Sequence, residues 1–249
     1  MKFQLLPSLA LLFGLGSTQA ADLTVSAAAS LNNAFQELAP AFEASHPGTR
    51  LQTNFAASGA LLQQIARGAP VDVFVSADQS TMDQAQAQGL VKAEQRRNVV
   101  SNTLVLIVPA GSPQQPRSLA DLTQPAYPRV AIGLPASVPV GRYTQQVLQA
   151  AGLWTAIEPR IIGANNVRQA LDYVARGEVD AGFVYATDAA LVPGKVKVAF
   201  TVPTAQPILY PAAPVAASPQ PALAQQFVQW LLSPPAQAVL ARHGFGQPR

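Results

Sequence analysis

The sequence predicts an α/β protein that is folded into two lobes. Apolar segments of strand length alternate with amphipathic helical patterns along the whole chain, as in a sheet covered by helices. A Gly/Ser/Pro/Gln-rich stretch at 109–117 separates two such sets, and a Pro-rich passage at 203–219 precedes two final helices. If these helices pack back on the first set, the chain crosses between lobes twice and forms a hinge with a ligand cleft. We therefore expect lobe 1 at 21–100 plus 210–249, and lobe 2 at 101–209.

The elements of lobe 1 follow from the period of the apolar residues. The expected strands are 23–26, 51–55 and 71–76. The expected helices are 31–44, 81–88, 222–232 and 235–242, with another entered at Ser58. Pro40 lies inside the first helix and is expected to kink it or to force a restart.

Lobe 2 shows the same alternation, which favours a largely parallel sheet. The expected strands are 104–108, 130–132, 181–185 and 196–200. The expected helices are 143–150 and 167–175, and each is followed by a glycine, Gly152 or Gly177, of the kind that ends helices.

The first twenty residues have the pattern of an export signal. Lys2 precedes an apolar stretch at 5–15, and Thr18-Gln19-Ala20 resembles a cleavage site for a signal peptidase. The apolar stretch is too short for a stable membrane span. We expect a signal peptide at 1–20 with cleavage near Ala20. The chain has no cysteine, which excludes disulfides, a lipid anchor on cysteine and thiolate metal sites.

Composition argues against nucleic-acid binding. The net charge is +3, and removal of Lys2 with the signal leaves 15 basic against 13 acidic residues, or +2. The only adjacent basic pair is Arg96-Arg97, which we interpret as a solvated face, and no aromatic residues alternate with basic ones.

No catalytic or metal-binding motif is present. The sequence lacks G-x-S-x-G and S-x-x-K. Its two histidines, His46 and His243, fall in a turn and at a helix end, and no His/Asp/Glu cluster has metal-ligand spacing. We expect no enzymatic activity. An exported hydrolase using Ser30 or Ser58 stays the alternative from another class, although no general base accompanies either serine.

Two strand-to-helix turns of the first lobe share one construction. Ala27-Ala28-Ala29-Ser30 and Phe55-Ala56-Ala57-Ser58 each place small residues and a serine where a helix begins. A helix N-terminus has free N–H donors and favours anions. We expect Ser30 at an N-cap position, with Ser58 in an equivalent turn, and the two turns to share one pocket.

Lobe 2 carries three further candidate donors. Val140 lies in a Pro-Val-Gly segment at a helix start, Val167 follows the capping residue Asn166, and Tyr185 ends an apolar strand. Taken singly, each has an ordinary structural explanation.

Together these segments resemble the molybdate-binding proteins of bacterial ABC importers. The motifs that carry the resemblance are Ala27–Leu31, Phe55–Ser58, Gly68–Gln79, Val138–Tyr143, Val167-Arg168 and Gly182–Tyr185. The resemblance covers the whole mature chain. It implies a two-lobe periplasmic-binding-protein fold that closes on one tetrahedral oxyanion, molybdate or tungstate.

The resemblance also implies a set of site residues. Ser30 and Ser58 would each offer a hydroxyl and a backbone N–H, Val140 and Val167 a backbone N–H, and Tyr185 its phenol. Molybdenum would be held as the oxyanion, with no direct bond from the protein to the metal and no cofactor. The implied protein is a periplasmic monomer whose partner is a membrane permease.

The chemistry of these donors limits the ligand. None of the five positions carries an Asp or Glu carboxylate, the acceptor that the proton of hydrogen phosphate would favour, so phosphate is disfavoured. Sulfate carries no proton, so the residues leave it open. A ferric-binding site would need several phenolates or carboxylates, and a sugar site would need aromatic platforms beside the serines. We leave Arg142 and Arg168 outside the site as solvent-facing residues, and Asp78 and Asp188 as capping or hinge residues.

Overall fold

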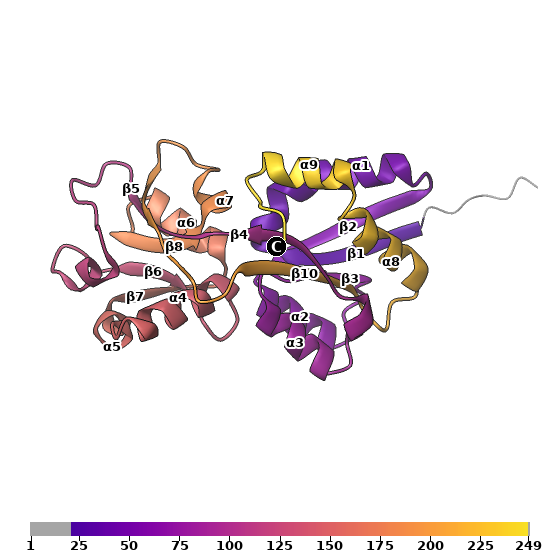
Figure 1. Ribbon diagram of the computed structural model, residues 1–249, viewed down its shortest axis with the longest axis horizontal. Helices are drawn as coiled ribbons and strands as arrows, with labels where there is room; N and C mark the ends of the chain where they lie inside the picture. The colour runs from indigo at the N-terminus through magenta and orange to yellow at the C-terminus, as the bar shows by residue number, and fades with distance from the viewer. Residues whose placement is uncertain (1–20, 249) are drawn as a thin grey trace, which may run out of the picture.

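The computed structural model describes residues 21–248, which form two five-stranded sheets with helices on both faces (Figure 1). The prediction of an α/β protein is confirmed. The expected signal peptide at 1–20 lies outside the described residues.

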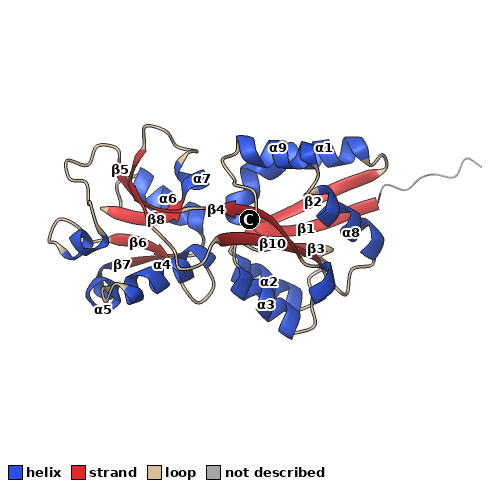
Figure 2. Ribbon diagram, viewed as in Figure 1, coloured by secondary structure: helices blue, strands red, loops and turns tan. Residues whose placement is uncertain are grey.

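The first sheet has the strand order β2-β1-β3-β10-β4. Its strands are β1 (Ala21–Ala28), β2 (Thr49–Ala56), β3 (Val73–Val75), β4 (Arg97–Asn102) and β10 (Ile208–Pro214). β1 runs parallel to β2 and β3, whereas β10 runs antiparallel to β3 and β4. The α1–α9 pair and the α2–α3 pair lie on opposite faces of this sheet (Figure 2). The helices that accompany it are η1 (Ala29–Leu31), α1 (Asn32–Ser45), α2 (Ser58–Ala66), α3 (Gln79–Ala87), η2 (Ala93–Gln95), α8 (Pro221–Trp230) and α9 (Pro234–Arg242).

The second sheet has the strand order β7-β6-β8-β5-β9. Its strands are β5 (Leu104–Pro109), β6 (Val130–Gly133), β7 (Ile161–Ala164), β8 (Ala181–Tyr185) and β9 (Val196–Thr201). β6 runs parallel to β7 and β8, and β5 runs antiparallel to β8 and β9. The accompanying helices are η3 (Leu119–Thr123), α4 (Pro139–Ala150), α5 (Trp154–Ile157), η4 (Glu158–Arg160), α6 (Val167–Ala175) and α7 (Ala186–Ala189).

The chain passes between the sheets twice, and we name the parts accordingly. Residues 21–102 and 208–248 carry the first sheet and are called the first half; residues 103–207 carry the second sheet and are called the second half. One link is the single residue Thr103 between β4 and β5, and the other is the segment 202–207 between β9 and β10. Figure 1 shows β4 and β10 extending side by side toward the second half.

Several local expectations were wrong. Both sheets are mixed, because β10 and β5 run against their neighbours. β10 lies inside the Pro-rich passage 203–219, where we expected no strand, and α1 continues through Pro40 without a restart. Arg96 is not a solvated side chain, since it is 16% exposed and pairs with Asp83 at 2.5 Å.

Aromatic and aliphatic side chains from distant segments form the core. In the first half, the rings of Phe42 and Phe227 meet edge to face with centroids 4.9 Å apart, so α8 is held against α1. Burial of each such ring contributes about 1.5–3 kcal/mol. Within the described part of the chain, no helix has both the length and the apolarity needed to cross a bilayer.

Candidate functional site

A small cavity lies where the two halves meet, and all five candidate residues line it. Its volume is about 10 Å³, close to the space of one water molecule, so only a compact ligand suits this arrangement. Residues of both halves form the wall, namely Ala28, Ala29, Ser30, Ala56, Ala57, Ser58, Ala77, Val138, Pro139, Val140, Asn166, Val167 and Tyr185. The alanines of the two serine turns keep the space free of larger side chains.

Ser30 reaches the cavity from a short 3-10 turn rather than from an N-cap. It lies inside η1, whose capping position is held by Ala28 without a side-chain hydrogen bond. The expected N-cap role of Ser30 was therefore wrong. Its Oγ lies 3.0 Å from the Oη of Tyr210, so the serine hydroxyl is fixed by a side chain far away in the sequence.

Ser58 is the first residue of α2, and Ala57 holds the capping position. The backbone N–H of Ala77 donates to Ser58 Oγ at 3.0 Å. Because the hydroxyl oxygen already accepts this bond, its own proton is available to a ligand in the cavity.

Val140 and Val167 place main-chain donors at two helix starts. Both lie in the first turn, of α4 and α6, where N–H groups have no acceptor within the helix. Gly141 lets α4 begin so close to β6, since a Cβ there would lie 1.8 Å from the oxygen of Gly133. Asn166 caps α6 by accepting from the Gln169 N–H at 3.0 Å, as expected.

Tyr185 brings a phenol with no partner. It is 1% exposed, and its Oη has no hydrogen bond to any described residue. Burial raises the pKa of this phenol well above its usual value, so the group stays protonated. An unpaired buried hydroxyl costs free energy, and a ligand oxygen in the cavity would remove that cost.

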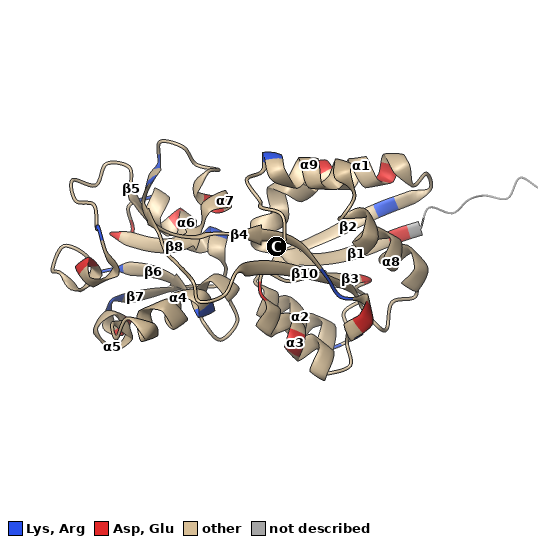
Figure 3. Cartoon of the chain, viewed as in Figure 1, with Lys and Arg blue, Asp and Glu red and all other residues tan. Residues whose placement is uncertain are grey.

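Charged residues flank the cavity without lining it. Figure 3 shows acidic and basic residues dispersed over both halves of the chain. The wall therefore offers neutral dipoles, of which the donors at the helix starts favour an anion.

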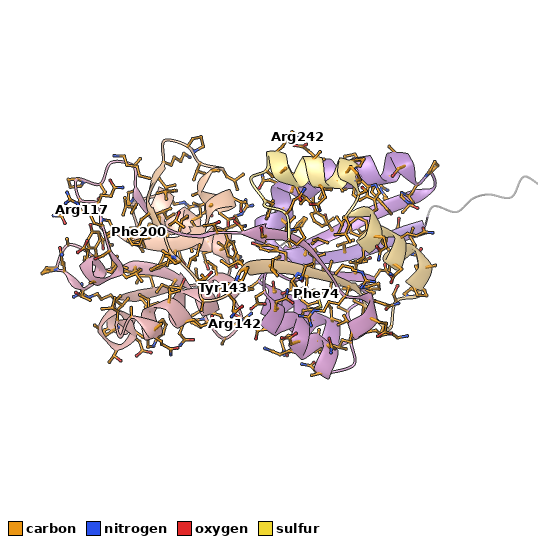
Figure 4. All side chains as sticks on the ribbon, viewed as in Figure 1. Phe74, Arg117, Arg142, Tyr143, Phe200 and Arg242 are labelled. Atoms are coloured by element: carbon orange, nitrogen blue, oxygen red, sulfur yellow. The ribbon has the colours of Figure 1, made fainter. Side chains whose placement is uncertain are left out.

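Two arginines of the second half bind across the junction, so our placement of them as solvent-facing residues was wrong. Arg142 donates from Nε to Asp78 Oδ2 at 2.7 Å and from Nη2 to Thr81 Oγ1 at 2.5 Å. Figure 4 shows Arg142 at the boundary where α4 approaches α2 and α3. Asp78 also caps α3, because its Oδ1 accepts from the Thr81 N–H.

Arg168 makes the second connection. Its Nη2 donates to the carbonyl of Ser30 at 3.0 Å, and its Nη1 donates to Asn33 Oδ1 at 2.7 Å. Its Nε lies 2.5 Å from Asp188 Oδ1, but the N–H is not aligned on that oxygen, so this contact is an ion pair without an aligned hydrogen bond. Burial raises the pKa of the Asp188 carboxyl to about 6, against the opposing effect of Arg168.

Sequence reasoning missed Tyr210 and Asn102, which stand behind Ser30. Tyr210 lies on β10, and the Asn102 amide donates to its Oη at 3.1 Å. The ring of Tyr210 also lies 5.8 Å from that of Tyr185. Nothing in the sequence indicated Tyr210, since it stands in the Pro-rich passage 203–219, where we expected no strand.

The histidines lie apart from the cavity. His46 stacks on Phe42, and His243 pairs with Glu37. Among residues 21–248, no group of three or more His, Cys, Asp or Glu side chains is arranged to hold a metal ion.

Two halves joined by two links, with a small donor-lined cavity between them, form an architecture that suits a solute-binding protein. The sequence profile of the family described as "Bacterial extracellular solute-binding protein" matches residues 23–246. The chain belongs to this family.

Individual relatives cover nearly the whole chain. It is 36% identical over 245 residues to the molybdate-binding protein ModA of Escherichia coli (strain K12), covering 95% of this chain and 94% of that protein. It is 37% identical over 235 residues to ModA of Mycobacterium tuberculosis (strain ATCC 25618 / H37Rv), covering 94% and 88%. The solved periplasmic molybdate-binding protein of Azotobacter vinelandii superposes with a TM-score of 0.78 at 28% identity, covering 91% of this chain and all of that one. The fold is thus the two-lobe fold of periplasmic binding proteins, as the resemblance implied.

Proposed function

We propose that this protein binds molybdate or tungstate in the cavity and delivers it to the membrane permease of an ABC importer. Ser30, Ser58, Val140, Val167 and Tyr185 would supply the hydrogen bonds. The convergence of these five residues from both halves on one cavity carries the proposal. The likeness to proteins named as molybdate-binding supports it.

The proposed working unit is an exported monomer without a cofactor. After removal of residues 1–20, the lobes would be 21–100 with 210–249 and 101–209, as the sequence predicts. They would act in the periplasm, opening and closing about the two links. Molybdenum would enter and leave as the oxyanion, with no bond from a protein atom to the metal.

The hydrogen bonds suffice for strong binding without a charged side chain in the wall. A hydrogen bond to an ionised group contributes about 1.5–3 kcal/mol. Two donors each from Ser30 and Ser58 and one from each other residue would give roughly 10–20 kcal/mol before the costs of association and closure. A net value of about 8–12 kcal/mol corresponds to micromolar to nanomolar affinity.

Sulfate is the nearest competing ligand, because it is a tetrahedral dianion without a proton. The donors that line the cavity treat both anions alike, so the distinction depends on the size of the closed cavity. Hydrogen phosphate is disfavoured, since its proton finds no carboxylate in the wall.

Hydrolysis and iron binding fit the geometry less well. The hydroxyls of Ser30 and Ser58 are bonded to Tyr210 and to the Ala77 amide, and no described histidine or carboxylate bonds to either one. Tyr185 and Tyr210 lie close together, but burial raises the pKa of both phenols, which opposes the phenolate form that ferric iron needs.

Calorimetric titration with molybdate, tungstate, sulfate and phosphate tests the proposal. We expect tight binding of molybdate and tungstate, weaker binding of sulfate and none of phosphate. Tight sulfate binding without heat from molybdate would reject the proposed ligand.

A further inference from the structure

A chain of hydrogen bonds leads from the links between the halves to the Ser30 hydroxyl. We propose that Tyr210 and Asn102 are positioning residues that fix the direction of this hydroxyl, so that Ser30 can only donate to the bound anion. This inference rests on the proposed function, and it adds two residues that do not line the cavity.

The orientation of the Asn102 amide is set by its neighbours. The backbone N–H of Thr103 donates to Asn102 Oδ1 at 2.8 Å, which identifies the amide oxygen. The amide nitrogen must then face the other two partners, Thr187 Oγ1 at 2.9 Å and Tyr210 Oη at 3.1 Å. Both N–H groups of the amide therefore donate hydrogen bonds, and Tyr210 Oη accepts one of them.

Because Tyr210 Oη accepts from Asn102, its own proton is available to donate to Ser30. Its side chain is fully buried, and the bonds of its Oη to described residues are those with Asn102 and Ser30. If Ser30 donated to Tyr210, the phenolic proton would be left buried without an acceptor, which is costly. Burial also raises the pKa of the phenol, so the proton is retained. Tyr210 therefore donates to Ser30 across the 3.0 Å contact.

Ser30 is left with one free proton, and the cavity is where it can be used. Its oxygen accepts from Tyr210 in the way that Ser58 Oγ accepts from the Ala77 amide. Each serine thus has a donor behind it and presents a proton to the ligand. The two serines differ in what orients the hydroxyl proton. For Ser58 it is a main-chain N–H, whereas for Ser30 it is side chains, which can be replaced by mutation.

The same chain connects the ligand with the junction of the halves. Asn102 ends β4, Tyr210 lies on β10, and Thr187 belongs to α7 of the second half. A rotation that separates Thr187 from Asn102 removes one bond of the amide. The orientation of the Ser30 hydroxyl proton is consequently most strongly fixed when the halves are closed.

The test is a double-mutant cycle on molybdate affinity at pH 7.5, measured by calorimetry. The variants are Tyr210→Phe, Ser30→Ala and the two combined. We expect Tyr210→Phe to weaken binding about tenfold, since Ser30 loses the partner that orders its proton. The combined variant should bind no more weakly than Ser30→Ala alone, because Tyr210 acts through Ser30.

Two controls accompany the cycle. Tyr127→Phe removes the phenolic hydroxyl of a different buried tyrosine, which lies in the second half and does not line the cavity. It should leave affinity within twofold. Phosphate, which the unchanged protein is expected not to bind, should gain measurable affinity in Tyr210→Phe, because Ser30 regains an acceptor for a protonated anion. A role confined to general packing would lower molybdate affinity without any gain for phosphate.

The outcomes separate the two proposals. If the unchanged protein binds neither molybdate nor tungstate, the proposed function fails, and this inference fails with it. If it binds but Tyr210→Phe stays within twofold, or the two losses multiply in the combined variant, the inference alone is overturned. Should Tyr210→Phe not fold, Asn102→Ala takes its place, with an expected threefold to tenfold loss that is likewise absent in the Ser30→Ala background.

Discussion

Arg142 Nε lies 2.7 Å from Asp78 Oδ2, and the two side chains come from different halves of the molecule. Both are largely shielded, with side-chain exposures of 16% and 4%. A shielded, hydrogen-bonded ion pair depends on geometry that is lost when its partners separate. Together with Arg168, this pair joins the halves in the closed arrangement.

Replacement of Arg142 should therefore weaken ligand binding with little effect on folding. In Arg142→Gln, closure would bury the Asp78 carboxylate without its cation, and we expect affinity to fall about tenfold to a hundredfold. The loss should appear mainly as faster ligand release in stopped-flow displacement. Arg96→Gln is the matched control, because its pair with Asp83 lies within the first half. Equal losses in the two variants would contradict a role in closure.

Gly59 should be essential for closure rather than for folding. Its N–H donates to the oxygen of Ser137 in the other half at 3.0 Å, and a Cβ on Gly59 would lie 2.6 Å from that same oxygen. We expect Gly59→Ala to lower oxyanion affinity at least tenfold, with an unliganded Tm within about 2 °C of the parent. Gly111→Ala, where a Cβ would meet no atom within 4 Å, is the control for calorimetry. Unchanged affinity in Gly59→Ala would exclude the closed arrangement from the binding reaction.

Tyr185→Phe should separate function from stability. The phenolic oxygen of Tyr185 has no partner among the described residues, so its removal leaves the unliganded protein equally stable or slightly more so. Ligand affinity should fall by about 1.5–3 kcal/mol, the contribution of one hydrogen bond to an anion. Thermal unfolding with and without molybdate measures both effects. A lower unliganded Tm combined with intact affinity would assign Tyr185 to the core alone.

Asp188 should make stability depend on pH in the acidic range. Its pKa is raised from 3.8 to about 6 in the folded protein, because burial outweighs the pairing with Arg168. The folded state therefore holds this proton more tightly than the unfolded chain, and the stability gained at low pH is lost as pH rises through about 6. Between pH 5 and pH 7.5 only part of this shift is realised, so we expect Asp188 to make the free energy of unfolding about 1.4 kcal/mol larger at pH 5 than at pH 7.5.

Asp188→Asn checks the assignment, since it should flatten the change in Tm between pH 5 and pH 7.5. The control is Asp180→Asn, whose carboxylate is part-exposed and pairs loosely with Arg129 at 3.6 Å. If Asp188→Asn keeps the slope of the parent, another group is responsible for it.

The sequence predicted the alternation of elements and the donors at helix starts, because both depend on nearby residues. Small residues before a helix start are visible in the sequence at Ala57 and Ser58, and Val167 follows a capping asparagine. The prediction that these segments share one pocket came from considering the two serine turns and the lobe 2 segments together, because each segment alone has an ordinary structural explanation.

The partners of the site residues could not be predicted in the same way. Tyr210 is 180 positions from Ser30, and Arg142 is 64 positions from Asp78. β10 was missed because Pro211 lies in it, but the strand register shifts between Tyr210 and Pro211, and this irregularity tolerates a residue without an N–H. The capping role expected of Ser30 was wrong because the chain makes a 3-10 turn before α1.

The unequal lengths of the two links have a mechanical consequence. Thr103 alone separates β4 from β5 and is held on both sides, by Asn102 Oδ1 at its N–H and by the Ala186 N–H at its carbonyl. The opposite connection, 202–207, is six residues long. A tether as short as Thr103 acts as a pivot, so a swing of one half displaces nearby atoms little and remote ones far. The contacts of Arg142 and of Gly59 across the junction would then break as the halves open, together with the bond between Asn102 and Thr187.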